Sequence, residues 1–371
     1  MNNLFRRIPT WGRWLLAALC ALLVFGMFAM VFRFTPEEMR DKPKIGFITL
    51  GDIHEPGWNQ SHYQGVKEAC EAMGADLLVR DHIPEGSGQC PEAIRELAAE
   101  GAGMIYLCSY GYAAEVKDVV REYPTIAFAT NASGNFPPNL TAHFVRMHQG
   151  RYLAGALAGM QTKSGVVGYV AAMPNSEVNR EINAFALGVR RVNPTARVVV
   201  AWTNAWEDEP TEKAHVRRLV REKGADLVTY HQDDQAVPDE AEALGINFIA
   251  FNARLSKRPH CLGAVICRWD MYYKNVIQSY LKGELNALQN HWIGINSGAI
   301  WLADIPENVG LDTGFVIAEL RRSLENRKPI FHGPIRDNAG TLRVGPQEVL
   351  RDDVLIYRMD WFVEGVEFLG E

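Results

Sequence analysis

The sequence predicts an α/β fold in which two doubly wound lobes, each a mostly parallel sheet with helices on both faces, are joined by a hinge. Short apolar runs rich in β-branched residues alternate with helical segments along most of the chain, which is the pattern of parallel sheets. The alternation comes in two series, which meet near Arg146. A length of 371 residues also exceeds one average hydrophobic core and favours about two domains.

Composition and charge narrow the classes of function. The chain is 47% hydrophobic and 22% charged, as in ordinary globular proteins. A net charge of -6 argues against a nucleic-acid-binding protein, which would need a basic face. Nine Trp residues are a high count for this length, and aromatic side chains beyond the needs of a core often line ligand pockets.

The N-terminus predicts a membrane segment. Arg6, Arg7 and Arg13 precede an uncharged run at 14–32, and about 19 residues in a helix nearly cross a bilayer. Basic residues before the run and acidic residues after it place the body of the protein outside the cytoplasm. Residues 1–35 are therefore a signal anchor or a cleaved signal peptide. We favour a retained transmembrane anchor because the run is long and lacks a clear cleavage site.

The chain is organised around its first strand, loop and helix. The apolar run 45–50 predicts a buried strand, Gly and Pro residues follow it, and Asn59 begins a helical segment. In open α/β sheets, ligands bind at the loops outside the carboxyl ends of the strands. In this loop the flat ring of Trp58 precedes the amide of Asn59, a pair that suits a planar, heteroatom-rich ligand. Trp58 could equally close the lobe over the sheet by packing alone.

The rest of the first series repeats the same alternation and forms most of the first lobe. Its first complete helix starts at Pro91, a residue type that is favoured in the first turn of a helix. The predicted elements are strands at 75–80, 103–109, 125–130 and 140–145, and helices at 91–100 and 113–122.

The second series begins with a helix whose Gly155 and Gly159 share one face and leave room for another backbone to approach. Gly224 marks the end of a later helix. The predicted elements are helices at 149–161, 177–192, 209–223 and 235–244, and strands at 166–172, 197–202, 227–230 and 248–252.

Residues beyond the second series predict a return to the first lobe. The strand 263–267 and the helix 271–282 follow the second series and are assigned to the first sheet. Two lobes joined by several crossings form a hinged clamp that holds a ligand between them. The predicted bounds are 44–146 and 254–290 for lobe 1, and 147–253 and 291–371 for lobe 2.

The C-terminal part predicts an ordered tail. The segment 327–341 is rich in Gly, Pro and polar residues and is typical of a wrap that ends in a turn. Trp361 and Phe362 are large apolar residues near the end of the chain. We therefore expect the tail to dock onto the domain.

Cysteine spacing and motifs indicate neither a metal site nor an enzyme. The six cysteines form no CxxC and no zinc-type spacing with histidine, and the chain has no P-loop, no GxSxG and no HExxH. We expect no cofactor, no metal and no catalytic residue. Cys20 lies in the membrane segment, so five cysteines in the exported body leave at least one thiol unpaired. Cys108, in a strand-like run, is expected to be a small buried hydrophobe.

Four stretches resemble the basic membrane protein family. They are VGYVAAMPNSEVNREINAFALGVRRVNP (167–194), AWTNAWEDE (201–209), GADLVTYHQDD (224–234) and MDWFVEGV (359–366). The resemblance extends from about Lys44 to the C-terminus. Members are periplasmic-binding-protein-like receptors and include purine nucleoside receptors of ABC importers. The resemblance implies a type I periplasmic-binding-protein fold and a purine nucleobase or nucleoside ligand.

The resemblance also implies a set of ligand-binding residues. Trp58 stands where the family has an aromatic residue stacked on the base, and Asn59 stands where it has an amide that contacts the base. The other implied residues are Tyr110 after the third strand, Arg180 and Asn183 in the second-lobe motif, Trp202 and Trp206 of the tryptophan pair, Gln232 and Asp233 of the HQD loop, and Trp269 in the returning segment.

Some of these positions admit more than one interpretation. Asn252 stands where nucleoside-binding members carry an acidic residue for the ribose hydroxyls, and an amide holds hydroxyls less strongly than a carboxylate. The amide at this position therefore favours a free base over its nucleoside as the ligand. Asp233 could accept a hydrogen bond from the base or cap the following helix. Arg180 could bind a purine carbonyl or pair with Glu177 or Glu181.

These observations predict an extracytoplasmic solute-binding receptor of an ABC importer, which closes on a purine-like ligand and delivers it to a permease. The N-terminal helix would anchor it to the inner membrane unless cleavage releases it. The alternative is a membrane-anchored sensor that signals to a membrane partner in its closed state.

Overall fold

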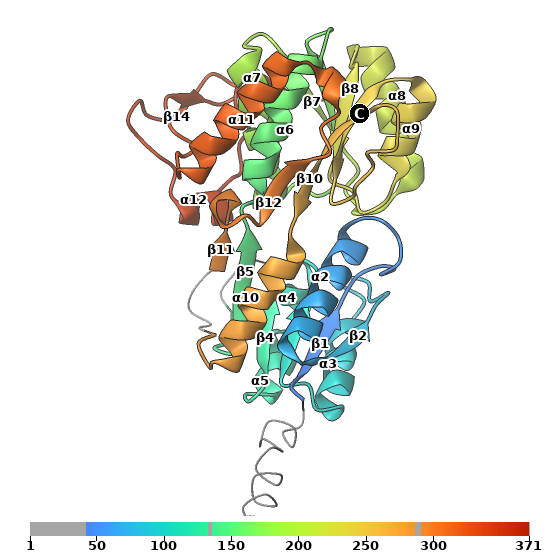
Figure 1. Ribbon diagram of the computed structural model, residues 1–371, viewed down its shortest axis with the longest axis vertical. Coiled ribbons are helices and arrows are strands. Elements are labelled where there is room, and N and C mark those ends of the chain that lie inside the picture. Colours follow the sequence, from blue (N-terminus) through green and yellow to red (C-terminus); the bar gives the residue numbers. More distant parts are fainter. Residues whose placement is uncertain (1–41, 133–135, 286–290, 371) are drawn as a thin grey trace, which may run out of the picture. The chain divides into compact units, whose positions relative to one another are not determined.

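The computed structural model describes residues 42–132, 136–285 and 291–370, and residues 44–371 form one compact unit (Figure 1). The predicted membrane segment and Cys20 lie outside the described residues. In the part that is described, no helix combines the length and the apolar character needed to cross a membrane.

The first sheet is parallel and has the strand order β11-β5-β4-β3-β1-β2. Helix α2 packs against α10, which joins this lobe from a distant part of the sequence (Figure 1). The strands are β1 (Lys44–Ile48), β2 (Asp76–Arg80), β3 (Met104–Leu107), β4 (Ala127–Thr130), β5 (Leu140–Val145) and β11 (His291–Ile293), and the helices are α2 (Trp58–Met73), α3 (Gln89–Ala99), α4 (Tyr112–Glu115), α5 (Lys117–Glu122) and α10 (Trp269–Leu281).

The second sheet has the order β12-β10-β9-β8-β6-β7-β15, and β12 alone runs antiparallel to its neighbour within the described pairings. Its strands are β6 (Val166–Ala171), β7 (Arg197–Trp202), β8 (Leu227–Tyr230), β9 (Asn247–Phe251), β10 (Cys261–Cys267), β12 (Ile300–Ala303) and β15 (Val366–Phe368). Its helices are α6 (Met147–Gln161), α7 (Ser176–Val192), α8 (Glu209–Lys223), α9 (Ala236–Leu244), α11 (Leu311–Glu325) and α12 (Asp352–Tyr357).

The strands and helices predicted along the two series are confirmed with small shifts of their ends, except that the helix predicted at 113–122 is divided into α4 and α5. The central strands are almost wholly buried, as strands of a parallel sheet with helices on both faces must be. The strands and helices after residue 290, including the helix α11, were not predicted, because their apolar patterns are short or irregular.

The prediction that strand 263–267 returns to the first sheet is wrong. This strand, β10, pairs with β9 and β12 in the second sheet, and the chain crosses to the first lobe only at α10. The short strand β11 then pairs with β5 in the first sheet, although residues 291–371 were assigned to lobe 2. A short apolar run fits the edge of either sheet equally well. The sheet that it joins is therefore set by the strand with which it pairs, and the run alone does not predict it.

The chain crosses between the two sheets three times within the described residues. The crossings lie between β5 and α6, between β10 and α10, and between β11 and β12 (Figure 1). Such crossings form a hinge, because a few residues in each connection can absorb the change of backbone angles when the lobes move.

Helices α6 and α7 approach closely through glycine, as predicted from Gly155. A Cβ atom at Gly155 would lie 2.0 Å from the carbonyl oxygen of Phe185, and one at Gly188 would lie 2.0 Å from the carbonyl oxygen of Tyr152. Any larger residue would push the two backbones apart. The glycines therefore set the position of α7, which supplies part of the pocket described below.

The C-terminal tail docks onto α7, as predicted. The Nδ2 atom of Asn183 donates to the carbonyl of Trp361 at 2.8 Å, and its Oδ1 accepts from the amide of Val363 at 2.9 Å. The ring of Phe362 packs against Trp202 with centroids 6.2 Å apart. Before the tail, β13 (Ile335–Arg336) and β14 (Leu342–Val344) pair as a short antiparallel turn.

The cysteines of the described body are all free. Cys108 is fully buried, which confirms its expected role as a small hydrophobe of the core. Burial also raises the pKa of the Cys108 thiol well above its ordinary value, so the group stays protonated.

Candidate functional site

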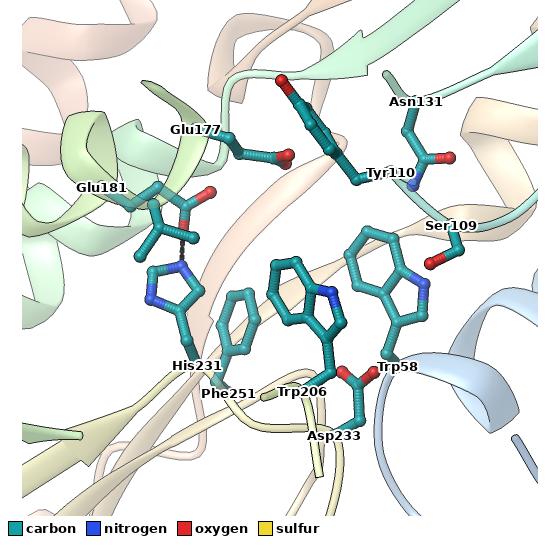
Figure 2. A pocket seen from close by; sticks show the side chains of 11 residues that line it. Trp58, Ser109, Tyr110, Asn131, Glu177, Glu181, Trp206, His231, Asp233 and Phe251 are labelled. Carbon is teal, nitrogen blue, oxygen red and sulfur yellow. Dashed lines mark hydrogen bonds and ion pairs between the residues drawn. The ribbon is translucent and has the colours of Figure 1, made fainter. Parts of the chain in front are cut away.

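A pocket lies at the carboxyl ends of strands from both sheets, where open α/β sheets bind ligands (Figure 2). Its walls come from the loops after β1, β3, β4, β7, β8 and β9 and from the first turns of α7. The lining residues are Trp58, Ser109, Tyr110, Asn131, Glu177, Val178, Glu181, Trp206, His231, Asp233 and Phe251.

Aromatic side chains form two sides of the pocket. Figure 2 shows Trp58, Trp206 and Phe251 in a row, with Tyr110 across the space from them. The indole of Trp58 is fixed in place, because its Nε1 donates to the carbonyl of Cys108 at 3.0 Å. A row of flat, apolar faces is suited to stacking on a planar ring.

A buried arginine supports the aromatic row from behind. The guanidinium of Arg151 lies 3.7 Å from the centre of the Phe251 ring. Its Nη2 donates to the carbonyl of Tyr230 at 2.8 Å, and its Nη1 contacts the hydroxyl of Thr229 at 3.3 Å. Arg151 is fully buried, so it stiffens this wall without facing the pocket itself.

Glu181 is held as a carboxylate by the groups behind it. Its Oε2 accepts from Nε of Arg151 at 3.1 Å and from Nε2 of His231 at 2.9 Å. Burial alone would raise the pKa of Glu181, but His231 and Arg151 outweigh it and hold the pKa at about 2. Burial and Arg151 lower the pKa of His231 to about 4, and Tyr169 contacts its Nδ1 at 2.8 Å. His231 is therefore neutral and carries its proton on Nε2.

Glu177 lies one helical turn before Glu181, so both carboxylates project from the same face of α7. Asn175 caps this helix through its Oδ1, which accepts from the amides of Glu177 and Val178 at 3.0 Å. Burial raises the pKa of Glu177 to about 7, against the opposing charge of Arg180. Among the described residues, no side chain donates a hydrogen bond to the Glu177 carboxylate, which points into the pocket (Figure 2).

Asp233 is a second carboxyl group whose pKa is raised, and unlike Glu177 it has no cation among the described residues that opposes the shift. Burial raises its pKa well above the ordinary value, and the neighbouring carboxylates of Glu207 and Asp234 raise it further. The alternative role of Asp233 as a helix cap is wrong, because the amide of Ala236 donates to Oδ1 of Asp234 at 2.8 Å. Asp233 is thereby left facing the pocket (Figure 2).

A further acidic residue, outside the pocket lining, braces the loop after β3. The carboxylate of Glu85 accepts from the hydroxyl of Ser109 and from the amide of Gly111, the latter at 2.6 Å. This fixes the backbone on either side of Tyr110. No Lys or Arg lines the pocket as the structure describes it, so its polar groups are suited to ligands that donate hydrogen bonds.

The two lobes touch at the mouth of the pocket. The Nε2 of Gln235 in the second lobe donates to the carbonyl of Pro56 in the first lobe at 2.9 Å. A Cβ atom at Gly57 would lie only 2.3 Å from the carbonyl oxygen of Asp233. The enclosed cavity has a volume of about 40 Å³, which is room for only one or two waters.

The pocket brings together four of the residues implied by the resemblance: Trp58, Tyr110, Trp206 and Asp233. Asn59 lies beneath the loop, where its Oδ1 accepts from the hydroxyl of Thr49 at 2.5 Å. Asn252 and Trp269 line a separate groove of about 470 Å³ beside α2. Asn252 has a positive φ of 52°, and neither atom of its amide has a hydrogen-bond partner among the described residues.

The remaining implied residues have structural roles outside the pocket lining. The Nη1 of Arg180 donates to the carbonyl of Leu355 at 2.9 Å, and the pairing with Glu177 or Glu181 is absent from the described ion pairs. Asn183 and Trp202 hold the C-terminal tail. Gln232 turns back, and its Nε2 donates to the hydroxyl of Thr203 at 3.1 Å.

Seven lining residues were not among the predicted ligand-binding residues. Four of them could have been found from their place directly after a strand or in the first turn of a helix, where parallel sheets put their sites. A further signal is the i, i+4 spacing of two glutamates in the motif EVNRE. The seven are Ser109, Asn131, Glu177, Val178, Glu181, His231 and Phe251.

Metal binding finds no support in the described residues, since they contain no group of three or more His, Cys, Asp or Glu side chains arranged to hold an ion. Glu177 and Glu181 lie on one side of the pocket and Asp233 lies on the other (Figure 2). The arrangement is that of a binding site in which rings stack and carboxylates accept hydrogen bonds.

Comparison with known proteins agrees with this geometry. The family model described as "ABC transporter substrate-binding protein PnrA-like" matches residues 42–325. A purine-binding protein of Brucella abortus is 30% identical over 336 residues, which cover 88% of this chain and 93% of that protein. A putative ABC transporter glucose-binding protein of Haloferax volcanii is 29% identical over 324 residues, covering 86% of this chain and 79% of the relative.

Solved structures show the same fold. An ABC transporter solute-binding protein from Aeropyrum pernix K1 superposes with a TM-score of 0.65 at 16% identity, covering 80% of this chain and 93% of that one. The predicted fold class of two α/β lobes with a hinge is confirmed, as is the resemblance drawn from the four sequence stretches.

Proposed function

The chain belongs to the PnrA-like family of ABC transporter substrate-binding proteins, which act outside the cytoplasm and hand a small molecule to a permease, and on this premise we propose that it binds a purine base or its nucleoside. The observation that carries the proposal is the pairing of aromatic faces with unpaired carboxylates in one pocket. The relative from Brucella abortus supports it, since that protein is named for purine binding.

The aromatic residues would hold the ring of the ligand. Stacking of a base on an aromatic side chain contributes about 1–3 kcal/mol. One ring therefore gives weak binding, whereas Trp58 with Trp206 or Tyr110 on the other face would reach micromolar affinity, which needs about 8 kcal/mol in total with hydrogen bonds.

The carboxylates would select the edge of the ligand. Glu177 and Asp233 lack a cationic partner in the lining of the pocket, and Glu181 is held ionised. Carboxylates accept from ring N–H groups and exocyclic amines, and these charge-assisted hydrogen bonds are stronger than neutral ones. Guanine, with an exocyclic amine and two ring N–H groups, would offer four N–H donors to these acceptors, against three in adenine and three in xanthine.

The relative from Haloferax volcanii, named for glucose binding, makes a hexose the competing ligand. Carboxylates also accept from sugar hydroxyls, and an aromatic ring also packs against a sugar. The chemistry that separates the two ligands is aromatic stacking on both faces of a flat ring, which a puckered hexose fits poorly.

Calorimetric titration of the purified chain would test the proposal. The ligands would be adenine, guanine, hypoxanthine and xanthine, their nucleosides, and glucose. We expect at least one purine to bind with micromolar or better affinity and glucose to give no heat. Binding of glucose without binding of any purine would overturn the purine assignment and leave the family intact.

The same titration addresses the ribose. Asn252, which stands in place of an acidic residue, lies in the groove beside α2 and outside the pocket lining. We expect the free base to bind at least as tightly as its nucleoside. A strong preference for the nucleoside would show that ribose contacts contribute most of the affinity.

A further inference from the structure

A second cavity lies beside the hinge, and the proposed binding of a purine does not use it. Its volume is about 400 Å³, roughly ten times that of the pocket. It is enclosed by the ends of β5 and β11, the start of α6, the segment after α11 and the segment leading into α12. We call it the hinge cavity. Its walls thus come from the first sheet, from helices of the second lobe and from two of the three crossings.

The hinge cavity is basic, although the chain is acidic. Three cationic residues line it, Arg146, Arg327 and Lys328, against one carboxylate, Asp352, in the described lining. The whole chain has a net charge of -6 and the purine pocket holds only carboxylates as charged groups. Concave sites lined by one sign of charge concentrate ions of the other sign.

Two of the cations have no carboxylate to neutralise them. Arg327 and Lys328 are exposed at the rim, and neither forms an ion pair within the described residues. The backbone of Arg327 has a positive φ of 59°, a conformation that residues other than glycine adopt at a cost. The turn therefore presents both cationic side chains at one place.

The third cation is fixed at the inner end of the cavity. Arg146 stacks on the ring of Trp292 at 4.2 Å and its Nη1 donates to Oδ1 of Asp352 at 2.9 Å. An arginine held by both stacking and an ion pair loses little side-chain entropy when it binds a ligand. Asp352 neutralises part of its charge, so the free positive charge of the cavity lies mainly at the rim.

A buried histidine adds an unused hydrogen-bonding group. His148 lines the cavity and is only 4% exposed, and its Nδ1 has no hydrogen-bond partner among the described residues. Its ring lies 5.4 Å from that of Trp292. A buried polar atom without a partner costs free energy, and a hydrogen bond from a ligand or water that reaches this ring would recover it.

We propose that the hinge cavity binds a small oxyanion, a phosphate or a carboxylate, between Arg327, Lys328 and His148. Arginine forks match planar carboxylates and tetrahedral phosphates alike, and lysine supplies a point charge. The apolar wall, which includes Phe331 and Leu355, favours an organic anion over an inorganic one.

The site would couple to the closure of the lobes. The three residues that hold the anion belong to the second lobe, whereas Trp292 in the opposite wall belongs to β11 of the first sheet. An anion that also contacts this wall stabilises the arrangement in which the two lobes are close at the crossing. By linkage, an anion that stabilises the closed state raises the affinity for the ligand of the pocket, and the ligand raises the affinity for the anion.

Direct titration of the full chain with inorganic phosphate, succinate and benzoate tests the site, and no purine is needed. The variant Arg327→Gln with Lys328→Gln should lower the affinity for the best of these anions at least tenfold. The matched control, Arg221→Gln with Lys223→Gln in α8, removes the same charge elsewhere and should leave the affinity unchanged. The anion series identifies whether the ligand is organic.

Two results would overturn the proposal. Absence of binding by all three anions at millimolar concentration would remove the site, and equal losses in the two double variants would show only a general effect of charge. The coupling has its own test, in which the dissociation constant of a bound purine is measured with and without saturating anion. An unchanged constant would refute the coupling. Since anion binding is measured without a purine, its outcome does not depend on the proposed function.

Discussion

At the scale of single residues, the pocket combines side chains held rigidly with side chains left unpaired. Trp58 is fixed by its hydrogen bond to the carbonyl of Cys108, and Glu181 is fixed by Arg151 and His231. Glu177, by contrast, has no hydrogen-bond donor of its own within the described structure. Rigid walls lower the entropy lost on binding, and unpaired acceptors provide the specificity.

Replacement of Trp58 by alanine should weaken ligand binding by about tenfold or more, because one stacking face is lost. The dissociation constant of the best purine, measured by calorimetry, checks this. Trp301→Ala is the control, since Trp301 is a half-buried tryptophan outside the pocket lining. An unchanged constant for Trp58→Ala would reduce Trp58 to a packing role.

Glu177 should make stability depend on pH. Its pKa rises from 4.5 to about 7 on folding, so the folded protein binds this proton more tightly than the unfolded chain. The contribution of Glu177 to the free energy of unfolding therefore falls as the pH rises from about 4.5 to about 7. Glu177→Gln cannot ionise, so its stability relative to the unsubstituted protein should increase over this range and level off above it. Urea denaturation at several pH values measures the difference.

The same substitution should act on binding with the opposite sign. The ionised carboxylate accepts from an N–H group of the ligand, so the affinity for an amino-purine should rise as pH passes through about 7. In Glu177→Gln the affinity should be lower at pH 8 and should lose this dependence. A variant with the same pH profile as the unsubstituted protein would exclude Glu177 as the acceptor.

At the scale of elements, close contacts through glycine set the geometry of the site. Gly155 and Gly188 bring α6 and α7 together, and α7 carries both glutamates of the pocket. Gly57, at the start of α2, lets the first lobe approach the backbone of Asp233 in the second lobe. The first contact is within one lobe and concerns stability, whereas the second lies between the lobes and concerns closure.

Gly57→Ala should therefore hinder closure without unfolding either lobe. The added Cβ would lie 2.3 Å from the carbonyl oxygen of Asp233, a distance that requires the lobes to separate. We expect the affinity for the best ligand to fall at least tenfold while the melting temperature without ligand changes little. Gly314→Ala is the control, because a Cβ there meets open space. An affinity that survives Gly57→Ala would mean that this contact is not part of the bound state.

At the scale of the whole molecule, three crossings let the two lobes move as rigid bodies. The pocket of about 40 Å³ is too small for a purine to enter as it stands, so the lobes have to separate first. The contact between Gln235 and Pro56 closes the mouth again. The basic hinge cavity lies beside two of the crossings and is placed to bias this movement.

Opening can be measured with spin labels on the full chain at Glu55 and Glu209, exposed positions on either side of the mouth. Without ligand we expect a broad distribution of distances between the two labels, and this distribution should extend beyond the distance found in the closed arrangement. Saturating ligand should shift it to one short distance. A pair at Glu209 and Asp239, both in the second lobe, should not respond. Identical distributions with and without ligand at the first pair would contradict hinge closure.

The sequence by itself determined the succession of strands and helices, the division into two similar lobes and the family. These follow from local patterns, such as the apolar run of β1 or the glycines of α6, and such patterns are largely independent of distant contacts. Trp58, Tyr110, Trp206 and Asp233 were implied by the resemblance to the family, and all four line the pocket at the ends of the strands.

Only the tertiary structure decided where the crossing strands and several site residues belong. β10 was assigned to the first sheet but pairs in the second, and β11 was assigned to the second lobe but pairs in the first sheet. Strand pairing depends on partners far away in the sequence, so local patterns did not predict it. Asn252 lies in a separate groove, and Trp269 packs edge-on against Trp58 with ring centroids 5.5 Å apart. Glu177 and Glu181 came into the pocket, because the packing of each element sets the direction of its side chains. Local sequence carries the pattern of burial, whereas the direction and partner of each side chain come from contacts that form only in the folded protein.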